Sequence, residues 1–412
     1  MSSPVSKSKA GSSMGRVEFI VLMAAMTALD AFSIDGMLPA LESIATDLHV
    51  LVENHRQYIV TALFFGFAFG VLIYGFLSDQ YGRRAPVVAG FIVFFFGSLL
   101  CIFAHTFSML LAGRVLQGFG AAGPYVLATA IVRDLYKGRD MAQIMSLISA
   151  VFIGVPMVAP FLGQGVMLLA GWRSFFVVLA VYAGLVLAWF WFRQKETLLP
   201  ENRQTLSVAV IKSSIVEVLT HHQFLRYLLA MSVALGAFIA YLSTAQQTFQ
   251  VIYNFGNWFP LVFAAIASVF GIGSVLNARW VHSVGSARLI HRALSVIVLV
   301  SCIYALMNLA IDGLPPAWIH LIYLCVFVFC FAFLFGNITS LALEPMGHIA
   351  GSASSLFNSI STIIAIGIAT TIGALLNDHV QPVIVGFGFF CAIALALNYS
   401  HARARSVTRT DR

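Results

Sequence analysis

The ten residues 75–84 (GFLSDQYGRR) connect two long apolar runs, and this arrangement constrains the fold more than any other stretch of the chain. Each run, 59–76 and 87–104, is close to the ~20 residues that a helix needs to cross about 30 Å of hydrocarbon. The charged link is too short to hold a folded domain, so it must turn the chain at a membrane surface. Its arginines, Arg83 and Arg84, indicate the cytoplasmic side of that membrane.

The composition extends this interpretation to all 412 residues. Hydrophobic residues make up 60% of the chain and charged residues 9%, whereas soluble proteins carry about 25% charged residues. We therefore expect an all-α integral membrane protein with twelve transmembrane helices in two six-helix halves. The twelve apolar runs are roughly 17–38, 56–77, 86–104, 108–132, 141–168, 173–192, 224–245, 258–280, 288–310, 316–340, 350–374 and 380–399.

A polar stretch separates the sixth run from the seventh, and it reads as a cytoplasmic linker with part of an interfacial helix. The predicted organisation is an N-terminal six-helix half (1–192), the linker (193–223), a C-terminal six-helix half (224–400) and a basic cytoplasmic tail (401–412).

The net charge of +7 reflects membrane topology, and we expect no nucleic-acid partner. Counting from a cytoplasmic N-terminus places 20 of the 23 lysines and arginines on the inner side. Arg56 and Arg173 fall outside, and Arg114 lies within a run. The asymmetry predicts a multi-pass membrane protein with both termini in the cytoplasm. The first run is too long for a signal peptide and contains two acids, so we expect it to be retained as the first helix.

Enzymatic chemistry has no support in the sequence. The five cysteines all lie in apolar runs and lack metal-ligand spacing. We find no Walker loop, no metal-ligand cluster and no nucleophile–base pair. We expect no catalytic residue, no metal and no cofactor.

Three charged residues lie well inside predicted spans: Asp30, Asp35 and Arg114. A charge at the bilayer centre costs about 2.5–3.5 kcal/mol on insertion scales, and such residues mark ion or substrate pathways. We predict that all three take part in proton coupling. Five residues correspond to about 140° of helix rotation, so we expect one acid to line a cavity and the other to face a neighbouring helix or the outer rim. The alternatives are a solvated helix-end carboxylate for Asp35, an interhelical contact for Asp30 and a structural ion pair for Arg114.

The link 75–84 resembles the loop between helices two and three of the major facilitator superfamily, G-x-L-x-D-x-x-G-R-[KR], at every fixed position. The resemblance implies a charged clasp on the cytoplasmic face, with glycines that let backbones approach closely. A basic turn of any polytopic protein is the alternative. The cytoplasmic gate residues so implied are Gly75, Asp79, Gly82, Arg83, Arg84, Arg133 and Asp134.

Further segments are similar to the bacterial drug:proton antiporters of the bicyclomycin-resistance (Bcr/CflA-type) branch, which implies a bacterial inner membrane as the location. The segment from Asp35 to Pro39 is similar to their helix-one motif, and Arg114-x-x-Gln117-Gly118 resembles their R-x-x-Q-G motif, which implies a role in proton coupling. The chain departs from the branch at residues 36–37 and 245–247. A segment that resembles the helix-five antiporter motif contains Gly154, Pro156, Pro160 and Gly163. Prolines bend a helix and glycines allow close packing, so we expect this helix to seal a gate; ordinary packing of small residues is the alternative.

The predicted cavity is rich in phenylalanine, which suits an amphipathic ligand and gives cation–π contacts to a cationic one. Polar residues expected to face the cavity are Gln117, Tyr125, Tyr241, Gln246, Gln247, Asn337 and Asn358, each of which could instead form an interhelical hydrogen bond.

Together these features predict a secondary transporter that exports small lipophilic or cationic drugs in exchange for protons by alternating access, with the proton gradient as energy source. Its partners are a small-molecule substrate, protons and the lipid bilayer, and the superfamily resemblance implies a monomer. The alternatives are an exporter of one metabolite or siderophore, a proton-coupled importer on the same fold, and a membrane sensor or scaffold that transports nothing.

Overall fold

The computed structural model describes residues 14–203, 208–310, 314–376 and 379–410, and in these ranges the chain is helical without any β-strand. Eleven helical segments in the described part are long and apolar enough to span a membrane. One of them, Ala317–Ala374, has 58 residues and contains two crossings joined by the short helix η6 (Glu344–Ile349). The described segments therefore supply twelve crossings, and the predicted fold class is confirmed.

The long helices follow the predicted spans closely. The first six are α1 (Arg16–Asp35), α3 (Tyr58–Tyr81), α4 (Arg84–Ile102), α5 (Phe107–Leu135), α6 (Gly138–Ala170) and α7 (Trp172–Arg193). The others are α9 (His222–Gln246), α10 (Phe259–Val284), α11 (Ser286–Ala310), α12 (Ala317–Phe331) with α13 (Phe335–Leu343), α14 (Ala350–Ala374) and α15 (Gln381–Thr410). Shorter helices connect them: η1 (Leu38–Ala40), α2 (Leu41–Asp47), η2 (Glu53–Gln57), η3 (Pro200–Asn202), α8 (Val208–Thr220), the π-helical η4 (Gln247–Ile252) and η5 (Gly256–Trp258).

Two details differ from the sequence prediction. The run 316–340 is not one helix, because Phe333 N donates to Cys330 O and Leu334 N donates to Phe331 O, which tightens the backbone into a 3₁₀-type turn between α12 and α13. The last helix also continues through residue 410, into the predicted tail 401–412.

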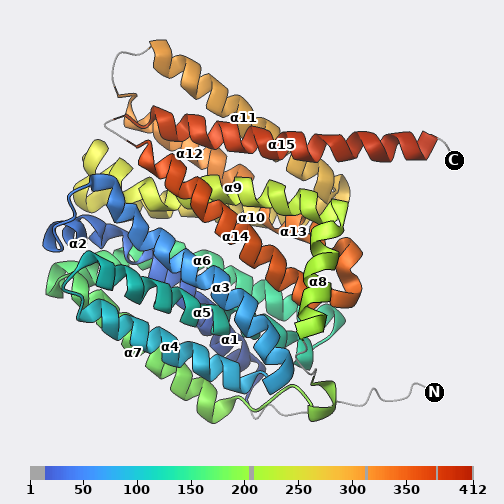
Figure 1. Ribbon diagram of the computed structural model, residues 1–412. Helices are drawn as coiled ribbons and strands as arrows, with labels where there is room; N and C mark the ends of the chain where they lie inside the picture. Colours follow the sequence, from blue (N-terminus) through green and yellow to red (C-terminus); the bar gives the residue numbers. More distant parts are fainter. Residues whose placement is uncertain (1–13, 204–207, 311–313, 377–378, 411–412) are drawn as a thin grey trace.

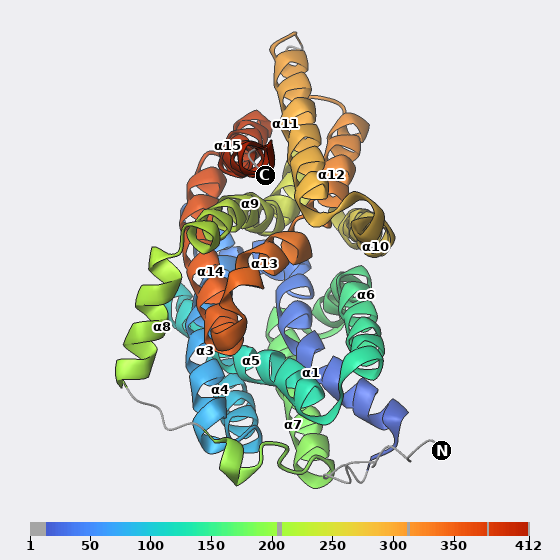
Figure 2. The ribbon, with the colours of Figure 1, turned by 90° about the vertical axis from the view of Figure 1, so that its right-hand side faces the viewer.

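The helices form two bundles. Helices α1–α7 make the lower bundle in Figure 1 and α9–α15 the upper one, with the linker helix α8 at one side. The main contacts between the bundles join α3 to α14 and α6 to α10. The start of α1, the end of α15 and α8 all lie toward the right in Figure 1, and we call this the linker end. Viewed from the linker end, α1 and α6 lie across the centre of the molecule from α10 and α13 (Figure 2).

Side-chain carboxamides join the two bundles at the end opposite to the linker, by hydrogen bonds to one another and to backbone carbonyls. Gln57 Nε2 donates to Gln247 Oε1 at 3.2 Å, and Gln247 Nε2 donates to Asn54 Oδ1 at 2.9 Å. Asn54 Nδ2 donates to Leu376 O at 2.7 Å, and Gln57 also donates to Gly373 O. We call Asn54, Gln57 and Gln247 the amide latch, which joins the two bundles at this end.

Candidate functional site

A cavity of about 260 Å³ lies between the two bundles. Most of its wall is aromatic and aliphatic, and α1, α3, α5 and α6 face α9, α10, α12, α13 and α14 across it. No lysine, arginine or histidine of the described chain lines this cavity, so its only charge is acidic. The polar lining residues are Asp30, Asp35, Tyr125, Tyr241, Asn358, Ser361 and Thr362.

Both intramembrane acids line this one cavity, although they are only 7% and 4% exposed. The expectation that only one of them could do so is wrong. At about 100° per residue, the α1 residues that line the cavity, Asp30, Ile34, Ala31 and Asp35, cover an arc of about 140° with the acids at its two edges. The rotation between the acids was estimated correctly, but the cavity is wide enough to include both.

Neither carboxylate has a hydrogen-bond or ion-pair partner among the described residues. One oxygen of Asp30, Oδ1, is inaccessible as well as unpartnered. Asp30 lies within electrostatic range of Arg114 and Tyr125, and Asp35 within range of Tyr241 on the opposite bundle. Two buried carboxylates without donors in an apolar cavity are energetically costly, which is the usual mark of a functional group.

Arg114 is fully buried, but no described carboxylate forms an ion pair with it. Its guanidinium instead donates to the carbonyl of Ile59 at 3.0 Å, the carbonyl of Ser33 at 3.1 Å and the side chain of Gln117 at 2.9 Å. The Ser33 carbonyl is available because Met37 N turns to Ile34 O at the end of α1. Arg114 therefore caps the C-terminus of α1, where a cation is favoured, and the ion pair considered for it is absent from the described structure.

Gln117 extends this network away from the cavity. Its Nε2 donates to Ser98 Oγ on α4 at 2.8 Å while its Oε1 accepts from Arg114. The next residue, Gly118, lets α5 approach α3 so closely that a Cβ there would collide with the Leu63 carbonyl. The R-x-x-Q-G motif thus ties α1, α3, α4 and α5 together and holds the two acids in place.

The remaining polar candidates divide into two groups. Tyr125, Tyr241 and Asn358 line the cavity as predicted. Four others do not line the cavity, so the prediction for them is wrong. Gln117 bonds in the network above, Gln247 in the amide latch and Asn337 with Asn277, whereas Gln246 donates to Gln250 but buries its Oε1 without a partner among the described residues.

The helix-five motif lies on α6, which packs against α1 in its own bundle and against α10 in the other. Pro156 lines the cavity and Pro160 is buried, within a continuous helix. A Cβ at Gly163 would collide with the carbonyl of Gly36, the residue after Asp35. Gly154 has open space where its Cβ would be, so close packing does not explain it.

The predicted charged clasp is centred on Arg83. Its guanidinium donates to Asp79 Oδ1 at 2.7 Å and to Asp134 Oδ2 at 2.9 Å. Burial lowers the pKa of Arg83, but the two carboxylates outweigh burial and hold that pKa above its usual value. Gly82 has φ of +87°, a conformation that favours glycine.

Among the other predicted gate residues, Gly75 allows Ser355 of α14 to approach, and the Arg84 guanidinium lies over the Trp191 ring, 4.5 Å from its centroid. Arg133 is exposed.

Glu196 in the linker completes the clasp, and the sequence analysis missed it. Its carboxylate accepts hydrogen bonds from the backbone N–H groups of Arg83 at 2.8 Å and Arg84 at 3.1 Å, and from those of Thr197 and Leu198. Burial raises the pKa of Glu196, but these donors outweigh burial and lower that pKa overall. The sequence did carry one signal for such a residue. A helix begins just after Gly82, and the first backbone N–H groups of a helix need an acceptor from outside that helix.

Two six-helix bundles around an apolar cavity with two buried acids define a polytopic membrane protein of the transporter class. The chain belongs to the Major Facilitator Superfamily, because the sequence model of that family matches residues 20–370.

Curated relatives agree with the predicted branch. The chain is 29% identical over 364 residues to the "Uncharacterized MFS-type transporter YdgK" of Bacillus subtilis (87% of this chain, 89% of the relative). It is 28% identical over 394 residues to the "Bicyclomycin resistance protein homolog" of Haemophilus influenzae (94% and 97%). It is 26% identical over 398 residues to the "Multidrug resistance protein MdtL" of Salmonella paratyphi C (95% and 97%). The chain is thus a transporter-family protein and not an enzyme.

Solved structures share the fold. The crystal structure of a D-xylose-proton symporter superposes with a TM-score of 0.71 at 14% identity, covering 92% of this chain and 97% of the symporter. At this identity the likeness concerns the arrangement of the helices alone.

Proposed function

We propose that this protein is a proton-coupled antiporter that exports small lipophilic or cationic compounds by alternating access. The supporting observation is the pair of buried, unpartnered carboxylates, Asp30 and Asp35, in one apolar cavity between the bundles. A buried carboxylate without a donor is stabilised by a proton or by a bound cation. A proton and a cationic substrate therefore compete for the same site, and this competition is the basis of exchange.

The two acids have different surroundings, which suggests a division of roles. Asp30 lies within electrostatic range of Arg114. Among the described residues, Asp35 forms no ion pair, and it lies within electrostatic range of Asp30 and Tyr241. We assign proton exchange mainly to Asp35, and to Asp30 the attraction of a cationic substrate.

Alternating access requires that the cavity open to each side in turn. We infer that the amide latch, which joins the two bundles, closes the cavity at the end opposite to the linker. The distribution of lysine and arginine predicts that the linker end is cytoplasmic, so the closed end is the outer one. Substrate and proton drive the cycle only through different affinities for the two states.

The names of the relatives support drugs as the substrate class, since one is a bicyclomycin resistance protein homolog and another a multidrug resistance protein. An apolar, aromatic wall with acidic groups as its only charges favours lipophilic cations over polar nutrients. An exporter for one metabolite or siderophore and an importer remain the alternatives, and the direction of coupled flux distinguishes export from import.

The test uses the purified protein in liposomes that contain a pH-sensitive dye, with tetraphenylphosphonium as the lipophilic cation. We expect a cation gradient to drive protons in the opposite direction, and Asp35→Asn to abolish this proton movement. Proton movement in the same direction as the cation would indicate a symporter. Cation flux without proton movement, or no flux for any of a panel of lipophilic compounds, would contradict the proposal.

A further inference from the structure

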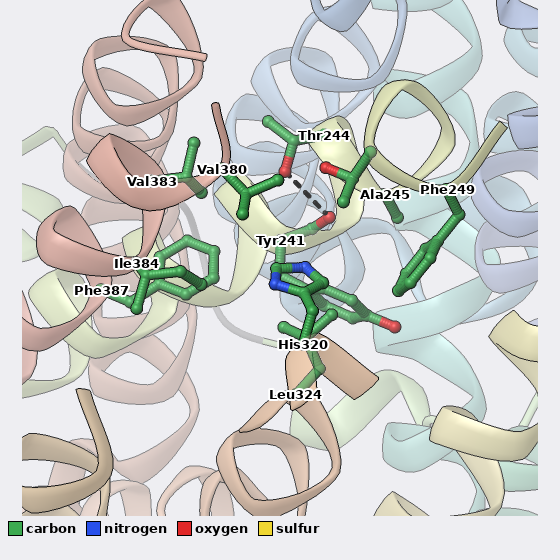
Figure 3. Close-up of a pocket in the computed structure, with 11 residues that line it drawn as sticks. Tyr241, Thr244, Ala245, Phe249, His320, Leu324, Val380, Val383, Ile384 and Phe387 are labelled. Atoms are coloured by element: carbon green, nitrogen blue, oxygen red, sulfur yellow. Dashed lines mark hydrogen bonds between the residues drawn. The ribbon is translucent and has the colours of Figure 1, made fainter. Parts of the chain in front are cut away.

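A second, much smaller cavity lies inside the C-terminal bundle, between α9, η4, α12 and α15 (Figure 3). Its volume of about 10 Å³ is close to the minimum that holds one water molecule. Most of the wall is apolar, but His320 of α12 and Thr248 of η4 also line it. Tyr241 lines both this cavity and the central one, so the small cavity lies directly behind the wall of the central cavity.

His320 is 3% exposed and has only one of its two ring nitrogens paired within the described structure. Its Nδ1 lies 3.2 Å from the hydroxyl of Tyr304 on α11. The rings of Phe249 and Tyr253 pack on the imidazole, with centroids 5.8 and 5.4 Å away. Its Nε2 has no protein partner among the described residues, although buried polar groups are nearly always hydrogen-bonded.

Thr248 presents a second unpaired polar group to the same space. It is 5% exposed, and its hydroxyl has no hydrogen-bond partner among the described residues. Thr244, one turn earlier on the same wall, differs in this respect because its hydroxyl donates to Ala240 O at 2.7 Å and also lies near Tyr241 O (Figure 3). Thr248 lies in a π-helical turn, a rare geometry that is often found at functional sites.

We propose that the small cavity is a specific binding site for one buried water molecule, held between His320 Nε2 and the Thr248 hydroxyl. Water both donates and accepts, so it satisfies either neutral tautomer of His320. The water joins η4 to α12. Because Thr248 follows Gln247 in the chain, the site positions the segment that carries the C-terminal part of the amide latch. The proposal is independent of the transported substrate and of the coupling ion.

The test is a double-mutant cycle on the full-length protein in detergent, read as the temperature of thermal unfolding. Thr248→Val and His320→Leu each remove one partner of the same water, so the double variant should unfold close to the temperature of His320→Leu alone. Thr244→Val is the matched control: its hydroxyl is already paired, so its effect should add to that of His320→Leu. Additive effects for Thr248→Val as well would overturn the proposal.

A direct measurement covers the case in which His320→Leu does not fold. A high-resolution density map of the unmodified protein should show one peak within hydrogen-bond distance of both His320 Nε2 and Thr248 Oγ1. The peak should persist in Thr248→Ser, which keeps the hydroxyl, and disappear in Thr248→Val. A cavity without density in the unmodified protein would overturn the proposal.

Discussion

Arg114 Nη2 donates a hydrogen bond of 3.1 Å to the carbonyl of Ser33, midway between the two acids of α1 along the chain. This contact joins the R-x-x-Q-G motif to the cavity through the backbone of α1. The contribution of Arg114 to the site is therefore both its charge near Asp30 and the position it gives to the end of α1. The two contributions are separable by substitution.

Arg114→Lys keeps the charge but loses the planar fork that reaches three acceptors on three helices. We expect it to leave the Ser33 carbonyl, which has no donor within α1, without a partner, at a cost of about 1–3 kcal/mol, and to reduce coupled transport about tenfold, the effect of 1.4 kcal/mol. Thermal unfolding and liposome transport measure the two effects. Arg139→Lys, at an exposed position, is the control and should change neither. Full activity in Arg114→Lys would show that charge alone is required.

Replacing the acids should separate function from stability. Neither carboxylate has a described partner to lose, so Asp30→Asn and Asp35→Asn remove a buried charge without breaking a hydrogen bond. We expect unfolding temperatures that are unchanged or raised, with proton movement reduced to background in Asp35→Asn. Asp79→Asn provides the contrast, because it removes a 2.7 Å ion pair with Arg83 and should lower the unfolding temperature. A marked loss of stability in Asp35→Asn would indicate a structural role for this acid.

The sequence was sufficient for the fold because each span is encoded locally, by a run of apolar residues between charged turns. It was harder to predict from the sequence which polar residues line the cavity. Asn337 is a polar residue inside an apolar run, like Tyr125 and Asn358, and only the packing of distant helices decides which of them meets a partner. The error for the two acids had another origin, because helix rotation gives the angle between them but not the width of the cavity.

Glu196 was missed for a related reason. Its role depends on a turn more than a hundred residues earlier in the chain, where Gly82 exposes the first N–H groups of α4. Nothing within the linker distinguishes Glu196 from Glu201, which is exposed. The two glutamates can therefore be compared directly.

Glu196→Gln should destabilise the protein in a pH-dependent way. The folded state lowers the pKa of Glu196, so its ionised form contributes stability above the unfolded value of about 4.3, and this contribution is lost as pH falls through the lower folded pKa. We expect a difference of about 1 kcal/mol at neutral pH that decreases at pH values below about 4. Thermal unfolding across this pH range measures it. Glu201→Gln should show no such difference, and a pH-independent effect of Glu196→Gln would contradict the assignment.

Gln57→Leu should weaken the amide latch, because it removes the hydrogen bonds to Gln247 and to Gly373 of the other bundle. Each bond contributes about 0.5–1.5 kcal/mol, so the population open at that end should rise roughly two- to tenfold per bond. Ser361→Cys in the cavity wall reports this opening by its reaction with a membrane-impermeant thiol reagent. Gln250→Leu is the matched control, since Gln250 bonds within its own bundle. Equal labelling in both variants would argue against the latch.

The two glycines of the α6 motif should respond in opposite ways to alanine. A Cβ at Gly163 collides with the carbonyl of Gly36, so Gly163→Ala must push α6 from the end of α1 and displace Asp35, at a cost of about 1–3 kcal/mol. Gly154→Ala meets open space and should be neutral or stabilising by up to about 1 kcal/mol, because alanine is the better helix former.

Unfolding temperature and proton movement should therefore both fall in Gly163→Ala and both persist in Gly154→Ala. Loss of transport in Gly154→Ala with normal stability would show instead that this part of α6 closes against another helix during the cycle. Such a contact would require another conformation, since here no described atom outside the local helix backbone lies within 4 Å of that Cβ position.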